Sequence, residues 1–542
     1  MKRSPRRWQH TALWTLLLVS LLAASPLQDF HFKLSQQLEI FASVLTEIDR
    51  YIYASDIAKA VKTGIHAMIQ SLDPYAQFVT EDDTDGLQDF VAGEHSGIGA
   101  VIDIRQEKPT VMALYKDCPA HKGGLRVGDI ITQVNGEEVM DQSIAYIRRL
   151  FEGMPDTRIQ LTVVRPLSST PLTLTLTREK LRLKSVPYFS TLQEGIGYIR
   201  LARFMSYAAD EVRAALDSLQ AEGAWALILD LRGNPGGILE EAVSVANLFI
   251  EQGQPIVTTQ GKETSLVSVF TTEQPAHDPD IPVVALIDQQ SASCAEIVAG
   301  VLQDYDRAVL MGNSTFGKGL VQVTTPLCYD TQLTLTAAKY YIPSGRGIYK
   351  DPQQQAVTSA RQAFATQAGR LVYEGDGITP DIEQDKLSLA PISHSLVSSD
   401  LIFDYATLFQ AQYKRIAPPK NFALSDAQYG EFMDWLQDKV YPYSIEQNIA
   451  QLQQQTHVEA YAADVREQID ALRARLQSHR LQDLQHHASE IKLLLQEAIV
   501  QRYYPQEGII EVMLTHDQSI RRACALLKDP LQYRRILQAD AE

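Results

Sequence analysis

The feature that most constrains the fold is a short apolar run followed by a tight turn and a second apolar segment, within residues 281–323. The run at 283–287 reads VVALI, which predicts a strand that is buried on both faces. After the turn, apolar residues recur at helical spacing from Cys294 onward, so we expect Ser293 at the first helical turn. A strand, a turn and a helix in this order are typical of an α/β fold.

Ser293 at a helix N-terminus is a candidate nucleophile. The first N–H groups of a helix lack partners and the helix end carries partial positive charge, so an oxyanion is stabilised there. The serine hydroxyl needs a base, yet no histidine occurs between His277 and His394 and no GxSxG motif is present. Lys318, in the string TFGKG, is the alternative, because a lysine in a crowded apolar site loses its proton more readily. Gln322 can orient the lysine head group as a third member.

The strings SASCAE and TFGKGLVQ resemble the carboxy-terminal processing proteases, also called tail-specific proteases or peptidase family S41. In that family the usual string is SASASE, a lysine follows the nucleophile by 25 residues, and a glutamine follows the lysine by four, which fits Ser293, Lys318 and Gln322. Cys294 and Ala295 replace an alanine and a serine of the usual string. The resemblance implies a serine endopeptidase that needs no metal and no cofactor.

The string DLRGNPGG, which begins at Asp230, joins a predicted strand to a predicted helix. It resembles the DLRxNxGG segment of the same family. The resemblance implies an oxyanion hole made by the N–H group of Gly236 or Gly237 together with that of Cys294. Asp230 and Arg232 are expected to fix the turn through hydrogen bonds.

Residues 89–180 carry a second signature. The string EHSGIGAVIDI places glycines before a strand, and an Asn-Gly pair between alternating apolar segments indicates a hairpin. Together with the helix SIAYIRRLFEG, these segments resemble a PDZ domain of the bacterial protease type, which binds a peptide as an added strand and its terminal carboxylate on loop N–H groups. The loop residues implied are Gly97, Ile98, Gly99 and Ala100. A PDZ domain that only braces the protease is the alternative.

The ends of the chain and its charge bear on location. Residues 1–25 predict an export signal, with a basic start, an apolar run and small residues at its end; an uncleaved membrane anchor is the alternative. Both interpretations place the body in the periplasm or cell envelope of a bacterium. The net charge of −17 argues against a nucleic-acid partner. The four cysteines are scattered without metal spacing, and an exported protein could pair some of them.

At 542 residues the chain needs several domains. We predict a multidomain α/β (α+β) protein: a helical N-terminal region at 28–88, a β-rich PDZ module at 89–180, an α/β protease core at 185–385 and a helical C-terminal domain at 386–542. The resemblance adds a homodimer as an expectation, because the N-terminal region assembles dimers in some family members. The C-terminal domain lies outside the resemblance, and it is expected to act as a scaffold, a dimer contact, a lid or a docking site for a partner.

The function predicted from the sequence is that of an exported serine endopeptidase with a Ser–Lys dyad supported by glutamine. It would cleave proteins near their C-termini, after the free C-terminus of the substrate has bound the PDZ domain. Peptide binding would also align the dyad by moving that domain. Two other functions stay open: an inactive peptide-binding scaffold, and an adaptor that acts through the helical tail.

Overall fold

The computed structural model describes most of the chain after the predicted export signal, which itself lies outside the described residues. The described ranges are 26–53, 56–79, 94–168, 170–262, 267–329, 331–350, 361–385, 389–439, 441, 452, 463–505 and 507–538. The chain divides into two compact units, which are described separately. The first unit comprises Met1–Phe78 and Thr324–Leu335, and the second comprises Val79–Val323 and Thr336–Glu542.

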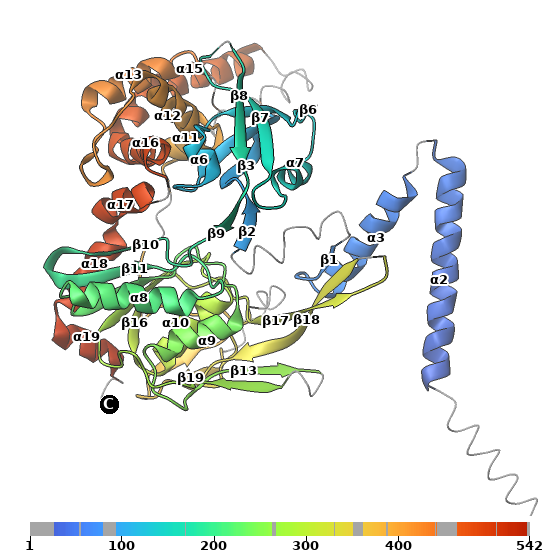
Figure 1. Cartoon of the computed structure of the whole chain (residues 1–542), viewed down its shortest axis with the longest axis vertical. Helices are drawn as coiled ribbons and strands as arrows, with labels where there is room; N and C mark the ends of the chain where they lie inside the picture. Colours follow the sequence, from blue (N-terminus) through green and yellow to red (C-terminus); the bar gives the residue numbers. More distant parts are fainter. Residues whose placement is uncertain are drawn as a thin grey trace, which may run out of the picture. The chain divides into compact units, whose positions relative to one another are not determined.

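The first unit contains the helices α2 (Pro26–Tyr51) and α3 (Ile57–Leu72), both labelled in Figure 1. Asp56 caps α3 by accepting a hydrogen bond from the amide of Lys59, and the helix ends at Asp73, directly before a proline. Among the described helices, none is long and apolar enough to cross a bilayer. Exposed apolar side chains of α2 include Phe32, Leu34, Leu38, Ile40, Phe41 and Val44.

In the second unit, the predicted PDZ module is an antiparallel sheet with its own core. Its strands, in spatial order, are β3 (Ala100–Arg105), β4 (Lys108–Leu114), β5 (Ile130–Val134), β7 (Arg158–Val164) and β8 (Leu172–Thr177), with β6 (Glu137–Glu138) beside β5. A separate two-stranded sheet pairs β2 (Glu94–Gly97) with β9 (Glu179–Arg182). The module also contains the helices α6 (Pro119–Lys122) and α7 (Ile144–Phe151). Asn135 and Gly136 both have positive φ, as the Asn-Gly hairpin between β5 and β6 requires. Strand β3 forms one edge of this sheet.

A six-stranded sheet forms the centre of the predicted protease core. Its strands, in spatial order, are β10 (Tyr188–Thr191), β11 (Ile196–Arg200), β12 (Ala226–Asp230), β15 (Val283–Ile287), β16 (Ala308–Gly312) and β21 (Ile382–Glu383). All neighbours from β11 onward are parallel, and only the edge strand β10 runs antiparallel. Every residue of β12, β15 and β16 is buried, as expected for strands covered on both faces.

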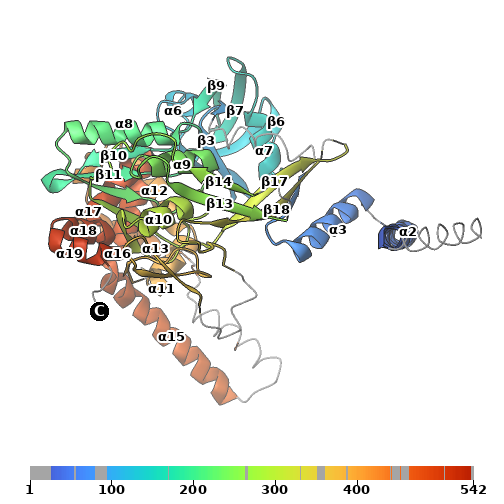
Figure 2. The ribbon, with the colours of Figure 1, turned by 90° about the horizontal axis from the view of Figure 1, so that it is seen from below.

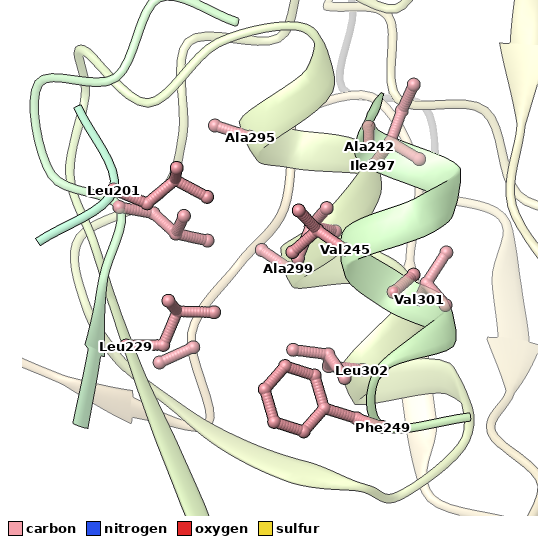
Figure 3. Close-up of a cluster of buried hydrophobic side chains, with 14 of the residues drawn as sticks. Leu201, Leu229, Ala242, Val245, Phe249, Ala295, Ile297, Ala299, Val301 and Leu302 are labelled. Carbon is pink, nitrogen blue, oxygen red and sulfur yellow. The ribbon is translucent and has the colours of Figure 1, made fainter. Parts of the chain in front are cut away.

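Helices cover both faces of this sheet. The helices α8 (Ala208–Ala221), α9 (Leu239–Asn247) and α10 (Cys294–Asp304) cover one face. Side chains of α9 and α10 pack there against Leu201 and Leu229 (Figure 3). The other face is covered by α18 (Gln518–Leu527) and α19 (Pro530–Leu537), which lie on the side of β10 and β11 opposite α8 (Figure 2). The last helices of the chain therefore complete the protease core.

The remaining strands include β17 (Leu320–Pro326) and β18 (Gln332–Tyr341), which contain residues of the first unit, and the remaining helices build the C-terminal region. The other strands are β13 (Pro255–Gly261), β14 (Ser268–Thr271), β19 (Ala363–Ala365) and β20 (Leu371–Tyr373). The helices are α11 (Pro391–Ser398), α12 (Leu401–Gln412), α13 (Asp426–Leu436), α15 (Ala463–His486), α16 (Ala488–Tyr503) and α17 (Glu507–His516). Helices α11, α12, α13, α15 and α16 share a separate hydrophobic core, whereas α18 and α19 do not belong to it. The predicted fold class, a multidomain α/β protein with helical N- and C-terminal regions, is confirmed.

The contact between α19 and β15 generates a stability prediction. The hydroxyl of Tyr533 donates to the carbonyl of Val283 at 2.9 Å and accepts from its amide at 3.0 Å, and Val283 is fully buried. Replacing Tyr533 by phenylalanine leaves both groups without this partner, which should lower the free energy of unfolding by about 1–3 kcal/mol. Urea unfolding of Tyr533→Phe measures the change. Tyr329→Phe, at a tyrosine that is 90% exposed, is the control, and equal midpoints for the two variants would contradict the prediction.

Candidate active site

The turn after β15 holds Ser293 in a strained conformation. Ser293 is the N-cap residue of α10 and has φ 54° and ψ −115°, a region that residues with side chains rarely adopt. Hydrogen bonds fix the turn before it: Asp288 accepts from the amide of Ser291, whose hydroxyl donates to the carbonyl of Leu231 at 2.9 Å. The surrounding bonds therefore impose the strain, at the residue predicted as the nucleophile.

One carboxylate joins the two segments that carry the predicted dyad. Oε2 of Glu296 accepts from the amide of Ser293 at 2.8 Å and from the amide of Lys318 at 2.9 Å. Its Oε1 accepts from the amide of Gly317 at 2.7 Å and from the hydroxyl of Thr315 at 2.5 Å. Because a single oxygen atom bonds both Ser293 and Lys318, their amide nitrogens cannot be farther apart than the two hydrogen bonds together allow.

The environment of Glu296 brings the pKa of its carboxyl group close to neutral pH. Its side chain is fully buried. This burial raises the pKa of Glu296 to about 7, and the hydrogen bonds to its oxygens, which favour the ionised form, oppose the rise. Only the ionised carboxylate can accept from all four donors, because protonation replaces an acceptor site by a donor.

The predicted lysine and glutamine also meet. Nζ of Lys318 donates to Oε1 of Gln322 at 3.0 Å, and both side chains are half-buried. Lys318 lies in the loop before β17 and Gln322 lies in that strand, so the four-residue spacing is bridged at a loop–strand junction. The amide oxygen limits where the lysine head group can lie, as expected for an orienting third member.

The glycine turn of the predicted oxyanion hole packs directly against Ser293, the predicted nucleophile. A Cβ atom at Gly236, which has φ 98°, would lie 2.8 Å from Cβ of Ser293 and 3.0 Å from the amide nitrogen of Cys294. The amide of Gly236 already donates to Oδ1 of Asn234 at 2.9 Å. For the amides of Gly237 and Cys294 no partner is recorded within the described ranges, so of the two predicted glycines Gly237 has the amide that is available to an oxyanion.

The thiol of Cys294 supports this turn. Its Sγ donates to the carbonyl of Gly237 at 3.1 Å. Burial raises the pKa of the Cys294 thiol to about 12, so it stays protonated and is no second nucleophile. All four cysteines of the chain are free, which leaves the expected pairing of some of them without support in this structure.

Charged side chains anchor the start of the glycine turn. Asp230 accepts from the backbone amide, Nε and Nη2 of Arg232, as predicted, and in addition from Nη1 of Arg200 and the hydroxyl of Tyr198. Burial would raise the pKa of Asp230, but Arg232 and Arg200 outweigh it and hold that pKa well below its usual range. The turn is therefore attached to an ionised, fully bonded carboxylate.

The predicted peptide-binding loop lies between β2 and β3. Gly97 ends β2, Ile98 and Gly99 are buried, and Ala100 begins the edge strand β3. Gly99 has φ 75°, and a Cβ atom there would lie 2.3 Å from Cβ of Cys118, so only glycine fits. Helix α7 packs next to β3. An edge strand beside a helix is an arrangement to which an extended peptide can add.

Sequence reasoning named Ser293, Lys318, Gln322 and the glycine turn as candidates, but it missed Glu296. The signal was present, because the string S-C-A-E from Ser293 to Glu296 fits the capping-box pattern S-x-x-E. In the part of the chain that is described, no group of three or more His, Cys, Asp or Glu side chains is placed to hold a metal ion.

Three family models match the chain. Residues 195–355 match the peptidase family S41, residues 110–165 match a PDZ domain, and residues 392–527 match a family described as "Probable PDZ-protease, C-terminal helical domain". The last match extends the likeness beyond residue 385, where the resemblance seen in the sequence ended.

Two named proteins align with most of the chain. A carboxy-terminal-processing protease of Bartonella bacilliformis is 32% identical over 359 residues, which are 66% of this chain and 76% of that protein. A protein of Staphylococcus haemolyticus named "Probable CtpA-like serine protease" is 29% identical, over 65% of this chain and 71% of the relative. Among solved structures, the photosystem II D1 C-terminal processing protease is 25% identical, covers 64% of this chain and 87% of its own, and has a TM-score of 0.37.

The position of Glu296 generates a prediction about the reactivity of Ser293. In Glu296→Gln the side-chain NH2 group faces either the amide of Gly317 or the amides of Ser293 and Lys318, so in each orientation the site loses at least one backbone bond. Displacement of reacting groups by about 1 Å costs on the order of 100-fold in rate. We expect labelling of Ser293 by a fluorophosphonate probe to slow by about that factor.

The matched control is Glu251→Gln, at an exposed glutamate. It makes the same chemical change and should label at the wild-type rate. Equal labelling rates for Glu296→Gln and the wild type would show that the shared carboxylate does not position Ser293.

Proposed function

The chain belongs to peptidase family S41, the carboxy-terminal processing serine proteases, and we propose that it cleaves proteins with Ser293 as nucleophile and Lys318 as general base. The observation that carries this assignment is the bonding of both residues' amides to one oxygen of Glu296. The hydrogen bond from Lys318 to Gln322 supports glutamine as the orienting member.

The proposed reaction proceeds in two halves. Oγ of Ser293 attacks the scissile carbonyl carbon while its proton moves to Nζ of Lys318. The carbonyl electron pair moves to oxygen, where the amides of Gly237 and Cys294 stabilise the charge. Collapse expels the amine, which takes the proton from Lys318 and leaves an acyl-enzyme. Water then attacks the ester with the same base, and the released proton returns to Oγ of Ser293.

Substrate selection is proposed to occur at the PDZ domain. The C-terminal segment of a protein adds as a strand along β3, and its carboxylate binds the loop of Gly97, Ile98, Gly99 and Ala100. The exposed side chains of Val101 and Ile104 on β3 support this proposal, because they offer apolar contacts along the open edge. Binding there also activates the enzyme by shifting the domain toward a form in which the dyad is aligned.

Export is the third part of the proposal. The basic and apolar pattern of residues 1–25 supports secretion into the periplasm or cell envelope of a bacterium. The substrates in that compartment are then proteins with free C-termini.

The dyad assignment predicts the effect of two substitutions. Ser293→Ala removes the nucleophile and Lys318→Ala removes the base, so each should lower kcat/KM for a protein substrate by at least about a thousandfold. Ser293→Ala should also abolish fluorophosphonate labelling. Mass spectrometry of the digest measures turnover and locates the cleavage sites.

Lys262→Ala, at an exposed lysine, is the control and should retain activity. Turnover that survives in Lys318→Ala would falsify the assignment of lysine as the base. Wild-type protein that neither labels nor cleaves would instead favour the inactive peptide-binding scaffold.

Peptide capture predicts a dependence on the terminal carboxylate. We expect a peptide with a free C-terminus to bind Ser293→Ala at least about tenfold more tightly than the same peptide ending in an amide, since the amide removes the charge held by the loop. Isothermal calorimetry measures both affinities, and a peptide blocked only at its N-terminus is the control. Equal affinity for the acid and the amide would contradict capture at Gly97–Ala100.

A further inference from the structure

The N-terminus of α18 meets the turn that carries the predicted oxyanion hole. Asp517 caps α18 by accepting from the amides of Ser519 and Ile520. Its Oδ2 also lies 2.7 Å from Nη1 of Arg232, and the Asp517 side chain is only 8% exposed. A helix from the end of the chain is thus ion-paired to the residue that begins the glycine turn.

We propose that Asp517 is a positioning residue for the oxyanion hole, supplied to the protease core by the C-terminal helices. It acts through Arg232 and touches neither substrate nor reacting atoms. The inference rests on the proposed chemistry at Ser293 and adds a second, distant segment that the chemistry requires.

Charge balance supports this role. Asp230 is the partner of two cations, Arg200 and Arg232, and both are largely buried. A single carboxylate cannot neutralise two guanidinium groups, and Asp517 supplies the second negative charge. Without it, Arg232 keeps its bonds to Asp230 but loses the contact that fixes the other end of its guanidinium plane.

Hydrogen bonds connect the turn that follows Arg232 to the residues directly before Ser293. The amide of the next residue, Gly233, donates to Oδ1 of Asp288 at 2.9 Å. The carbonyl of Asn234 accepts from the amide of Ala292 at 2.9 Å, directly before Ser293. A shift of Arg232 therefore displaces both the glycine turn and the residues that precede the nucleophile.

The helix that supplies Asp517 is itself fixed to the sheet. Ile520, Ala523, Leu526 and Leu527 of α18 are buried in the cluster that covers the second face of the six-stranded sheet. Ser519 donates to the side chain of Gln384, next to β21. Because α18 is held by apolar burial over its length, Asp517 is a rigid reference point for the turn.

Removing the charge of Asp517 has two opposite effects on kcat. Loss of a negative charge near the hole favours the oxyanion electrostatically and would raise kcat. Loss of the positional constraint misaligns the hole amides, and removal of one oxyanion donor alone costs about 100- to 1,000-fold in kcat. We expect the positional effect to dominate, because the amide groups act only at hydrogen-bond distance from the oxyanion.

The test is Asp517→Asn, which keeps a good helix cap and removes the charge. We expect kcat for a C-terminal peptide substrate to fall about tenfold with KM unchanged. A peptide aldehyde, whose adduct with serine places an oxyanion in the hole, should bind about tenfold more weakly. The matched control is Asp529→Asn, at the carboxylate that caps α19, for which no ion pair is recorded among the described residues.

The Asp517→Asn measurements distinguish a positioning role from a purely structural one. A loss in kcat and in aldehyde affinity, at a melting temperature equal to that of Asp529→Asn, supports the positioning role. An unchanged or raised kcat overturns it, and so does a loss that disappears once rates are corrected for the fraction of folded protein. If the wild type itself fails to label at Ser293, the proposed function fails, whatever Asp517→Asn does.

Discussion

The site depends on one buried carboxylate. The four groups that donate to Glu296 belong to two stretches of the chain: the N-terminus of α10, at Ser293, and the segment from Thr315 to Lys318. These stretches follow the neighbouring parallel strands β15 and β16, and the amide of Phe316 also donates to the carbonyl of Ser291 at 3.0 Å. An ionised carboxylate forms stronger hydrogen bonds than a neutral acceptor, and a dry site strengthens them further. These bonds offset part of the cost of burying the charge, and the pKa of Glu296 stays raised, at about 7, beside the predicted nucleophile and its predicted base.

A second constraint comes from the parallel sheet, which must be covered on both faces. Helices α8, α9 and α10 cover one face, and the chain returns after more than a hundred residues to cover the other with α18 and α19. The same C-terminal region contacts the PDZ module, through Arg105 with Asp400 and Asp404. The C-terminal helices thus contact both the PDZ module and the protease core.

The fold class and the local elements could be predicted because their signals are local. The VVALI run matches β15, and the helix begins at Cys294 as the periodicity indicated. The role of Glu296 could have been found from the capping-box spacing, but its bonds to the lysine loop could not, since they join residues that are distant in sequence. Asp517 gave no signal, because an aspartate before a helix reads only as a cap. Its ion pair with Arg232 joins segments that are distant in sequence, so only the tertiary structure reveals it.

The most direct test of the account is an NMR titration of protein labelled with 13C in its glutamate carboxyl groups and 15N in its amides. If Glu296 holds the site together, its carboxyl carbon should titrate near pH 7, and the amides of Ser293, Gly317 and Lys318 should shift with that same midpoint. Amide midpoints that differ from one another or from that of the carboxyl carbon would contradict the account. So would a carboxyl that titrates near its ordinary value of 4.5 while the amides stay unchanged.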